Sequence, residues 1–239
     1  MKTRTIAVFL LLFGVLTGGV SCKKLKKPAA IEEREQWIAS FADSIASYNK
    51  EIENATDSVK IINQKIEDIL HGFSHVVKER EVTGYYIASG WKDRLPLTST
   101  GLVARLNENE KLELIATLKG GVFNRIEASD GSGEVSTKVI PHDQALNYRA
   151  TGFNTVCFSG GDADTVAQFI SDNKGKKITV NYIDGKKTGS FVLSDAEKEM
   201  IYSTWQLCYL KNMARQLEKS ISFNARRIDI CRRMMDREE

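Results

Sequence analysis

The histidines of this 239-residue chain are the side chains with the clearest capacity for acid–base or metal chemistry. His71 and His75 lie four residues apart and Glu79 follows four residues later, so a helix would place all three on one face. Such a face could hold a divalent cation, but an exposed pair without supporting hydrogen bonds makes a weak site. We therefore interpret the pair as part of a solvated helix surface and predict no metal site.

Two further segments contain residues of the types used in catalysis or phosphate binding. His142 lies in a predicted loop, and no Ser or Cys nucleophile accompanies it in a recognisable motif. Ser159–Asp162 joins a predicted strand to a predicted helix, the layout in which backbone N–H groups receive phosphate. Asp162 and Asp164 would repel an anion, so we interpret both as helix caps. We predict no catalytic residue and no cofactor, and we expect a protein that is not an enzyme. An enzyme with a catalytic head domain is a further alternative, and it would require a cleft with converging ionisable groups.

The cysteines after position 22 predict thiols rather than a disulfide framework. Cys208 and Cys231 lie on one predicted helix, about 35 Å apart by the helical rise, which is too far for a bond. Cys157 falls in a predicted strand and is most simply a buried thiol.

The N-terminus has the pattern of a secretory signal peptide over residues 1–21. Lys2 and Arg4 precede an apolar run from Ile6 to Leu16, and small, turn-prone residues follow. The run is shorter than the roughly 20 residues needed to span a bilayer as a helix. We expect this segment to be removed.

The position of Cys22, directly after Val20 and Ser21, resembles the lipobox of bacterial lipoproteins over about the first 25 residues. Gly19 stands where that family usually has Leu, as in the looser lipoboxes of some Gram-negative phyla. The resemblance implies cleavage before Cys22 and attachment of a diacylglycerol and an acyl chain, which together make a stable anchor. The alternative is cleavage by ordinary signal peptidase, with Cys22 left as a thiol.

Residues 22–30 would then be a lipidated tether, with lysines at 23, 24, 26 and 27. These cations would be attracted to anionic lipid, although a solvated tether explains them equally well. No acidic cluster, which serves as a surface-export signal in some lipoprotein families, follows Cys22. We therefore expect a bacterial envelope protein anchored in the outer membrane and facing the periplasm, with the cell surface left open.

A seven-residue apolar repeat predicts a coiled-coil helix over 31–80. Its first seam row is Ile31, Ile38, Ile45, Ile52, Val59, Ile66 and Phe73, and Phe41, Tyr48, Ala55, Ile62, Ile69 and Val76 follow three residues later.

A second repeat predicts a helix over 195–237, introduced by Ser194 as N-cap. Its seam includes Met200, Leu207, Leu210, Ala214, Leu217, Ile221, Ile228, Cys231 and Met235. Asn224 interrupts the seam, and a buried Asn there costs stability but fixes register.

The two predicted helices would be about 75 and 65 Å long. Their similar lengths predict an α+β fold: a long antiparallel coiled-coil hairpin with an inserted, mainly antiparallel β-rich head domain over 82–193. The alternative is self-association of each seam with another chain, and the sequence leaves the oligomeric state open.

The predicted head contains eight strands and one short helix, 164–173. The strands are expected over Gly84–Ser89, Leu112–Leu118, Val122–Ala128, Glu134–Ile140, Ala145–Ala150, Asn154–Phe158, Lys177–Ile183 and Ser190–Leu193. Tyr85, Tyr86 and Trp91 form a candidate contact patch, with a core or hinge role as the alternative.

A formal net charge of +3 that is scattered along the chain does not favour nucleic acid as a partner. We expect a non-catalytic, lipid-anchored spacer, adaptor or scaffold whose partners are the membrane and another envelope protein. The alternative is a surface adhesin or a lipoprotein that binds a glycan or another ligand.

Overall fold

The computed structural model describes residues 31–77, 84–143, 145–150 and 152–236. The helices in these ranges are α1 (Ile31–Leu70), the 3-10 helix η1 (Ser89–Arg94), α2 (Gly161–Asp172) and α3 (Asp195–Asp236). The strands are β1 (Phe73–Val76), β2 (Tyr85–Ala88), β3 (Gly101–Asn107), β4 (Leu112–Lys119), β5 (Arg125–Ser129), β6 (Glu134–Ser136), β7 (Asn147–Ala150), β8 (Phe153–Ser159), β9 (Thr179–Asp184) and β10 (Lys186–Val192).

The strands form two antiparallel sheets. The larger sheet has the order β1-β2-β3-β4-β8-β7, and the smaller has the order β10-β9-β5-β6. In the larger sheet, Leu102 on β3 is paired with Ala116 on β4, and Leu106 with Leu112. Paired residues of neighbouring strands share a face, so these four apolar side chains make one continuous apolar surface.

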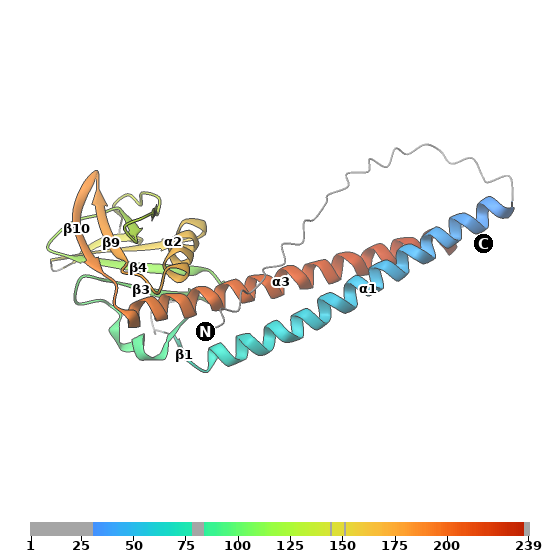
Figure 1. The fold of residues 1–239 in the computed structure, drawn as a ribbon, viewed down its shortest axis with the longest axis horizontal. Helices are drawn as coiled ribbons and strands as arrows, with labels where there is room; N and C mark the ends of the chain where they lie inside the picture. Colours follow the sequence, from blue (N-terminus) through green and yellow to red (C-terminus); the bar gives the residue numbers. More distant parts are fainter. Residues whose placement is uncertain (1–30, 78–83, 144, 151, 237–239) are drawn as a thin grey trace, which may run out of the picture.

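Helices α2 and α3 cover this apolar surface (Figure 1). Ala104 on β3 donates its backbone N–H to the Met200 Sδ on α3 at 3.1 Å. The Tyr182 hydroxyl, from the smaller sheet, donates to the Gly101 carbonyl on β3 at 2.9 Å and so links the two sheets. We call the two sheets together with α2 the β domain. Its hydrophobic core lies between the sheets and the first half of α3.

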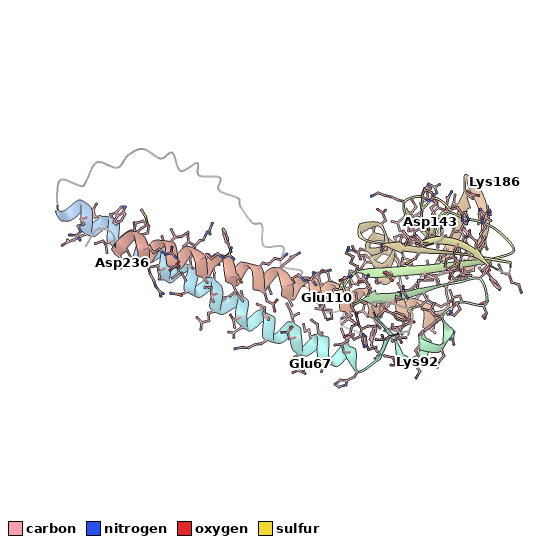
Figure 2. The ribbon with its side chains drawn as sticks, turned by 180° about the vertical axis from the view of Figure 1, so that it is seen from behind. Glu67, Lys92, Glu110, Asp143, Lys186 and Asp236 are labelled. Carbon is pink, nitrogen blue, oxygen red and sulfur yellow. The ribbon has the colours of Figure 1, made fainter. Side chains whose placement is uncertain are left out.

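Helices α1 and α3 lie side by side and run in opposite directions (Figure 1). With a rise of 1.5 Å per residue, α1 is about 60 Å long. The N-terminal end of α1 and the C-terminal end of α3 lie together, far from the sheets. Figure 2 shows the same separation, with Asp236 at one end of the molecule and Lys186 at the other.

The predicted fold class is wrong as a whole. The chain is α+β, with ten described antiparallel strands and a long helix near each end, but not a two-helix coiled-coil hairpin carrying a separate head. The physical reason is that the first half of α3 packs into the core of the β domain. Its residues Met200, Leu207, Leu210 and Ala214 belong to the same hydrophobic core as the strands. Ile66 of α1 also packs into that core.

The boundary of the first helix was also predicted wrongly. Helix α1 ends at Leu70, and residues 73–76 form β1 at the edge of the larger sheet instead of continuing the helix. Phe73 therefore belongs to a strand and pairs with Ala88. Residues 78–80 of the predicted helix lie outside the described residues.

The other predicted seam positions differ in burial. Ile66, Leu207, Leu210, Ala214 and Ile228 are buried, whereas Ile38, Ile45, Ile52, Val59, Leu217 and Ile221 are half-buried. The Ile31 side chain lies outside the described residues. Burial is thus greatest beside the β domain and lower towards the far end of α1.

Most of the predicted strands are present with shifted ends, and the predicted helix 164–173 is α2. β1 and β3 were not predicted. The signal peptide, the tether and the anchor residue Cys22 lie outside the described residues.

Candidate functional site

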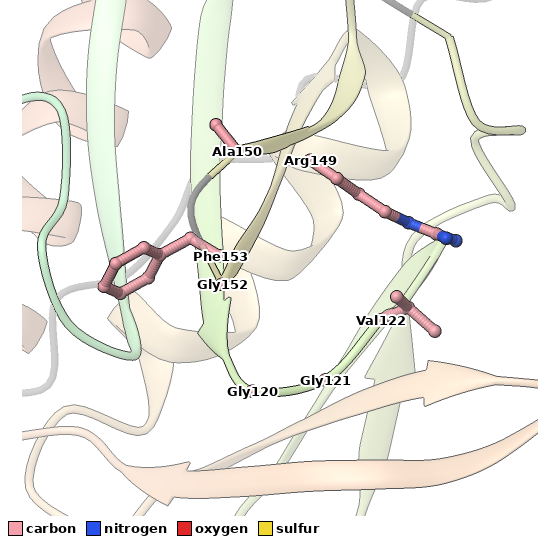
Figure 3. A pocket seen from close by; sticks show the side chains of 7 residues that line it. All are labelled: Gly120, Gly121, Val122, Arg149, Ala150, Gly152 and Phe153. Atoms are coloured by element: carbon pink, nitrogen blue, oxygen red, sulfur yellow. The ribbon is translucent and has the colours of Figure 1, made fainter.

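A wide depression of about 550 Å³ opens where the loop after β4 meets the β7–β8 turn (Figure 3). It is lined by Gly120, Gly121, Val122, Arg149, Ala150, Gly152 and Phe153. Gly120 and Gly152 have φ values of 72° and 82°, a region that favours glycine, and the Gly120 N–H donates to the Gly152 carbonyl at 2.8 Å.

Arg149 and Phe153 extend to opposite sides of this turn, with the Arg149 side chain reaching towards Val122 (Figure 3). Among the described residues that line the depression, Arg149 is the one ionisable side chain. The depression can therefore hold an anionic or apolar group, but these lining residues offer neither a nucleophile nor a base for catalysis.

A second cavity, of about 280 Å³, lies on the face of the larger sheet opposite the helices. We call it the sheet slot. Its lining comprises Leu95, Pro96 and Leu97 from the loop after η1, Arg105, Glu113, Ile115, Thr155 and Cys157 from the strands, and Ala145, Leu146 and Tyr148 beside and on β7. The register explains the strand residues, because Arg105 pairs with Glu113 and Ile115 pairs with Cys157.

Three polar side chains of the sheet slot, Arg105, Glu113 and Thr155, are hydrogen-bonded within the slot or to neighbouring side chains. Arg105 Nε lies 2.6 Å from Glu113 Oε2, and the Asn107 side-chain amide donates to Glu113 Oε1 at 2.9 Å. The Thr155 hydroxyl is 3.0 Å from that of Thr117. The slot therefore offers a ligand a lining that is partly polar and partly apolar, together with the exposed side chains of Leu146 and Tyr148 at its rim.

The Cys157 thiol in this slot is not poised for nucleophilic chemistry. Burial, together with the neighbouring Glu113 carboxylate, raises its pKa to about 12. A thiol with so high a pKa stays protonated at neutral pH and is a poor nucleophile. The slot is therefore suited to binding rather than to catalysis through this cysteine.

The β3–β4 turn contacts α3 and the edge strand β1 of the larger sheet. Glu110 at its tip has a φ of 58°, and its carboxylate pairs with Lys211 at 3.2 Å and with Arg215. Glu108 Oε1 is 2.9 Å from His75 Nε2 on β1. Figure 2 shows Glu110 where the β domain meets the long helices. The contacts of Glu110 hold the β domain against α3, and the contact of Glu108 holds β1 against the turn.

The predicted contact patch is not a single surface. Tyr85 is only 2% exposed, whereas Tyr86 is half-buried and lies on the other face of β2, with its ring centroid 4.7 Å from that of His75. Trp91, on η1, is half-buried against the core and stacks with the Arg94 guanidinium, 4.3 Å from the ring centroid. These three aromatic residues are close in the sequence, but the structure places them on different surfaces.

The predicted helical arrangement of the histidines is wrong. His71 follows the end of α1, and His75 lies on β1 opposite Tyr86, so the two do not share a helix face. Glu79 lies outside the described residues. Among the residues described, no group of three or more His, Cys, Asp or Glu side chains could hold a metal ion.

His142 is exposed in the loop before β7. The neighbouring Asp143 accepts hydrogen bonds from the backbone N–H groups of Ala145, Leu146 and Asn147, which lower the pKa of its carboxyl. Asp143 thus has a structural role in shaping the loop.

Ser159–Asp162 does lead into α2, but the capping prediction for Asp162 is wrong. Its carboxylate accepts the backbone N–H of Lys138 at 3.3 Å, from the segment after β6. Burial raises the pKa of Asp164. Neither residue makes a side-chain cap to the start of α2.

Cys157, Cys208 and Cys231 are free thiols. The sheet slot was missed because β3 was not predicted, although Leu102, Val103 and Ala104 form a short apolar run of the kind that a buried strand contains.

No helix among the described residues has the length and apolar character needed to cross a membrane. The sequence matches no protein-family model, and neither a curated protein nor a solved structure matches the chain.

Proposed function

We propose that this chain is a lipid-anchored protein of a bacterial envelope that acts as a non-catalytic adaptor or scaffold, holding its β domain away from the membrane to bind another envelope protein. The observation that carries the proposal is the distance between the two ends of the molecule. The N-terminal end of α1, which follows the predicted tether, lies at the far end of the helix pair from the sheets (Figure 1).

The pairing of α1 and α3 supports this role, because a single exposed helix of 40 residues would not keep its length and direction. Arg227 on α3 lies over the Tyr48 ring of α1, 5.2 Å from its centroid. Ala55 and Ile62 of α1 are buried nearer the β domain. The β domain is therefore held at a defined distance, up to about 60 Å from the start of α1.

The sheet slot supplies a surface for the partner. Leu146 and Tyr148 are large side chains exposed at its rim, beside apolar residues such as Leu97 and Ile115 and the paired Arg105 and Glu113. Aromatic and apolar side chains beside a pocket are typical anchors of protein interfaces.

The same slot also favours the second candidate function, a lipoprotein that binds a small ligand. At about 280 Å³ it lies just below the usual range of ligand cavities, so it fits a ligand of modest size. A ligand-binding protein would keep binding when the helices are shortened, whereas an adaptor that depends on reach would not.

The anchor is tested by metabolic labelling with radioactive palmitate in a bacterium that processes lipoproteins. The native chain should be labelled and recovered with membranes, and Cys22→Ser should abolish both. A matched Cys231→Ser variant should remain labelled. Absence of label in the native chain, or unchanged label in Cys22→Ser, would contradict the proposal.

A further inference from the structure

We propose that the outward face of α3 at its C-terminal end binds anionic phospholipid headgroups. We call this the basic face and define it as Lys219, Phe223, Arg226, Ile230 and Arg233. The inference rests on the proposed function and deepens it, because it names the surface by which the anchored chain meets the membrane.

The helical geometry places these side chains together. On α3, Asn224, Ile228 and Cys231 are buried and lie on the side towards α1. Residues 219, 223, 226, 230 and 233 recur at spacings of three and four, so they share one stripe, which points away from the buried side. The stripe is roughly 20 Å long by the helical rise.

Two large apolar side chains stand exposed in this stripe. Phe223 is 55% exposed and Ile230 is 59% exposed, and they lie seven residues apart. The Arg227 guanidinium stacks on the Phe223 ring, 4.3 Å from its centroid. Aromatic and aliphatic side chains among arginines and lysines are the composition of a helix that lies in a membrane interface.

The charge of the segment complements an anionic surface. Residues 219–233 contain five basic residues and one acidic residue, Asp229, which pairs with Arg233. Glu51 of α1, which comes close to this part of α3, is already hydrogen-bonded to Asn224. The basic face therefore keeps an excess of positive charge available to lipid phosphates, and each such charge strengthens binding to anionic headgroups.

The position of the basic face fits a membrane better than a distant partner. It lies in the half of α3 that is farthest from the sheets (Figure 1). A tether from Cys22 to Ile31 can extend over about 30 Å at most, so the far end of the helix pair stays near the bilayer of an anchored chain. Contact through the basic face would fix the tilt of the helices and thereby the position of the β domain.

The test uses the mature chain with Cys22→Ser, so that no acyl anchor contributes. The tether lysines 23, 24, 26 and 27 are replaced by Gln, so that they do not contribute either. Flotation with vesicles of 70% phosphatidylethanolamine and 30% phosphatidylglycerol is compared with flotation on pure phosphatidylcholine. We expect binding to the anionic vesicles alone and its loss in 0.5 M NaCl, because surface charges are screened.

Arg226→Gln with Arg233→Gln should weaken this binding on the order of thirtyfold. Phe223→Ser with Ile230→Ser should also weaken it without loss of helix content, since both side chains are exposed. Lys186→Gln with Lys187→Gln removes the same charge at the opposite end of the molecule and should change nothing (Figure 2).

Equal flotation on both kinds of vesicle, or no effect of the Arg226 and Arg233 changes, would overturn the inference. If free inorganic phosphate reduced flotation as much as the Arg226 and Arg233 changes do, the basic face would be an ion site rather than a lipid surface. That result would also overturn the inference. The palmitate labelling of Cys22 is independent of this measurement, so failure of the anchor and failure of the basic face are distinguishable.

Discussion

Asn224 on α3 donates a hydrogen bond to Glu51 on α1, with 2.8 Å between Nδ2 and Oε2. Asn224 is only 3% exposed, whereas Glu51 reaches solvent. A buried amide with a single charged partner on the neighbouring helix fixes how the two helices align along their length.

Asn224→Leu should raise the free energy of unfolding by about 1 kcal/mol, because a buried amide is replaced by an apolar side chain and the Glu51 carboxylate stays solvated. Urea denaturation measures the change. Asn212→Leu, at a half-buried position of the same helix, serves as the comparison. If Asn224→Leu instead lowers the free energy of unfolding by more than 1 kcal/mol, the hydrogen bond to Glu51 stabilises the fold and the prediction is wrong.

Substitutions at the neighbouring residues Ile61 and Ile62 distinguish the contribution of packing to stability from that of helix propensity. Ile62 is 6% exposed and belongs to the domain core, whereas Ile61 is 59% exposed. Ile62→Ala should cost about 2 to 4 kcal/mol, and Ile61→Ala should stay within about 0.5 kcal/mol. Thermal or urea unfolding of the two variants provides the measurement. Similar losses for both would mean that α1 does not pack against the β domain as the structure shows.

The carboxylate of Asp130 should make stability depend on pH in acid. Its pKa is held well below the usual value, first by Lys176, whose Nζ lies 2.5 Å from Oδ2, and then by hydrogen bonds from Ser132 and Gly133. A lowered pKa in the folded state means that this stabilisation is present above the unfolded pKa of about 3.9 and is lost as the pH falls further.

Asp130→Asn should therefore lower the free energy of unfolding at pH 6. Between pH 4 and pH 2 the variant should lose less stability than the native chain loses. Urea denaturation across this range compares it with Asp172→Asn, an exposed carboxylate at the end of α2. Parallel pH curves for the native chain and Asp130→Asn would refute the assignment.

Two of the thiols should be unreactive in the folded protein. Burial raises the pKa of Cys157 to about 12 and that of Cys208 to about 11. At pH 8 both should react with a disulfide reagent at least tenfold more slowly than in urea, because the thiolate is the reactive form. Single-cysteine variants monitored by absorbance measure each rate. A native rate equal to the rate in urea would contradict the burial of that thiol.

The sequence predicted the elements whose signals are local. Ser194 and the apolar repeat after it predicted α3, which begins at Asp195, and the Asp184-Gly185 pair predicted the β9–β10 hairpin, where Gly185 has a φ of 68°. The end of α1 was missed although Gly72 marks it. The apolar spacing continues through Phe73 and hides the change from a helix to a strand.

The tertiary arrangement could not be predicted in the same way. Met200 and Leu207 satisfy a helix–helix seam and a helix–sheet contact equally well, so the repeat alone did not show that α3 lies in the domain core. The sheet slot brings together Leu97, Ile115 and Leu146 from distant parts of the chain, and the strand order that unites them has no local signal.

The most direct test of the adaptor role is photo-crosslinking in intact cells from probes at Leu146, Tyr148 and Trp91. The measurement compares the native chain with one shortened by residues 45–51 of α1 and 224–230 of α3, which lie opposite each other and together shorten the helix pair by about 10 Å. We expect the native chain to capture one envelope protein repeatedly and the shortened chain, still folded, to capture much less of it. Capture of no protein, or equal capture by the shortened chain, would contradict an adaptor that works by reach.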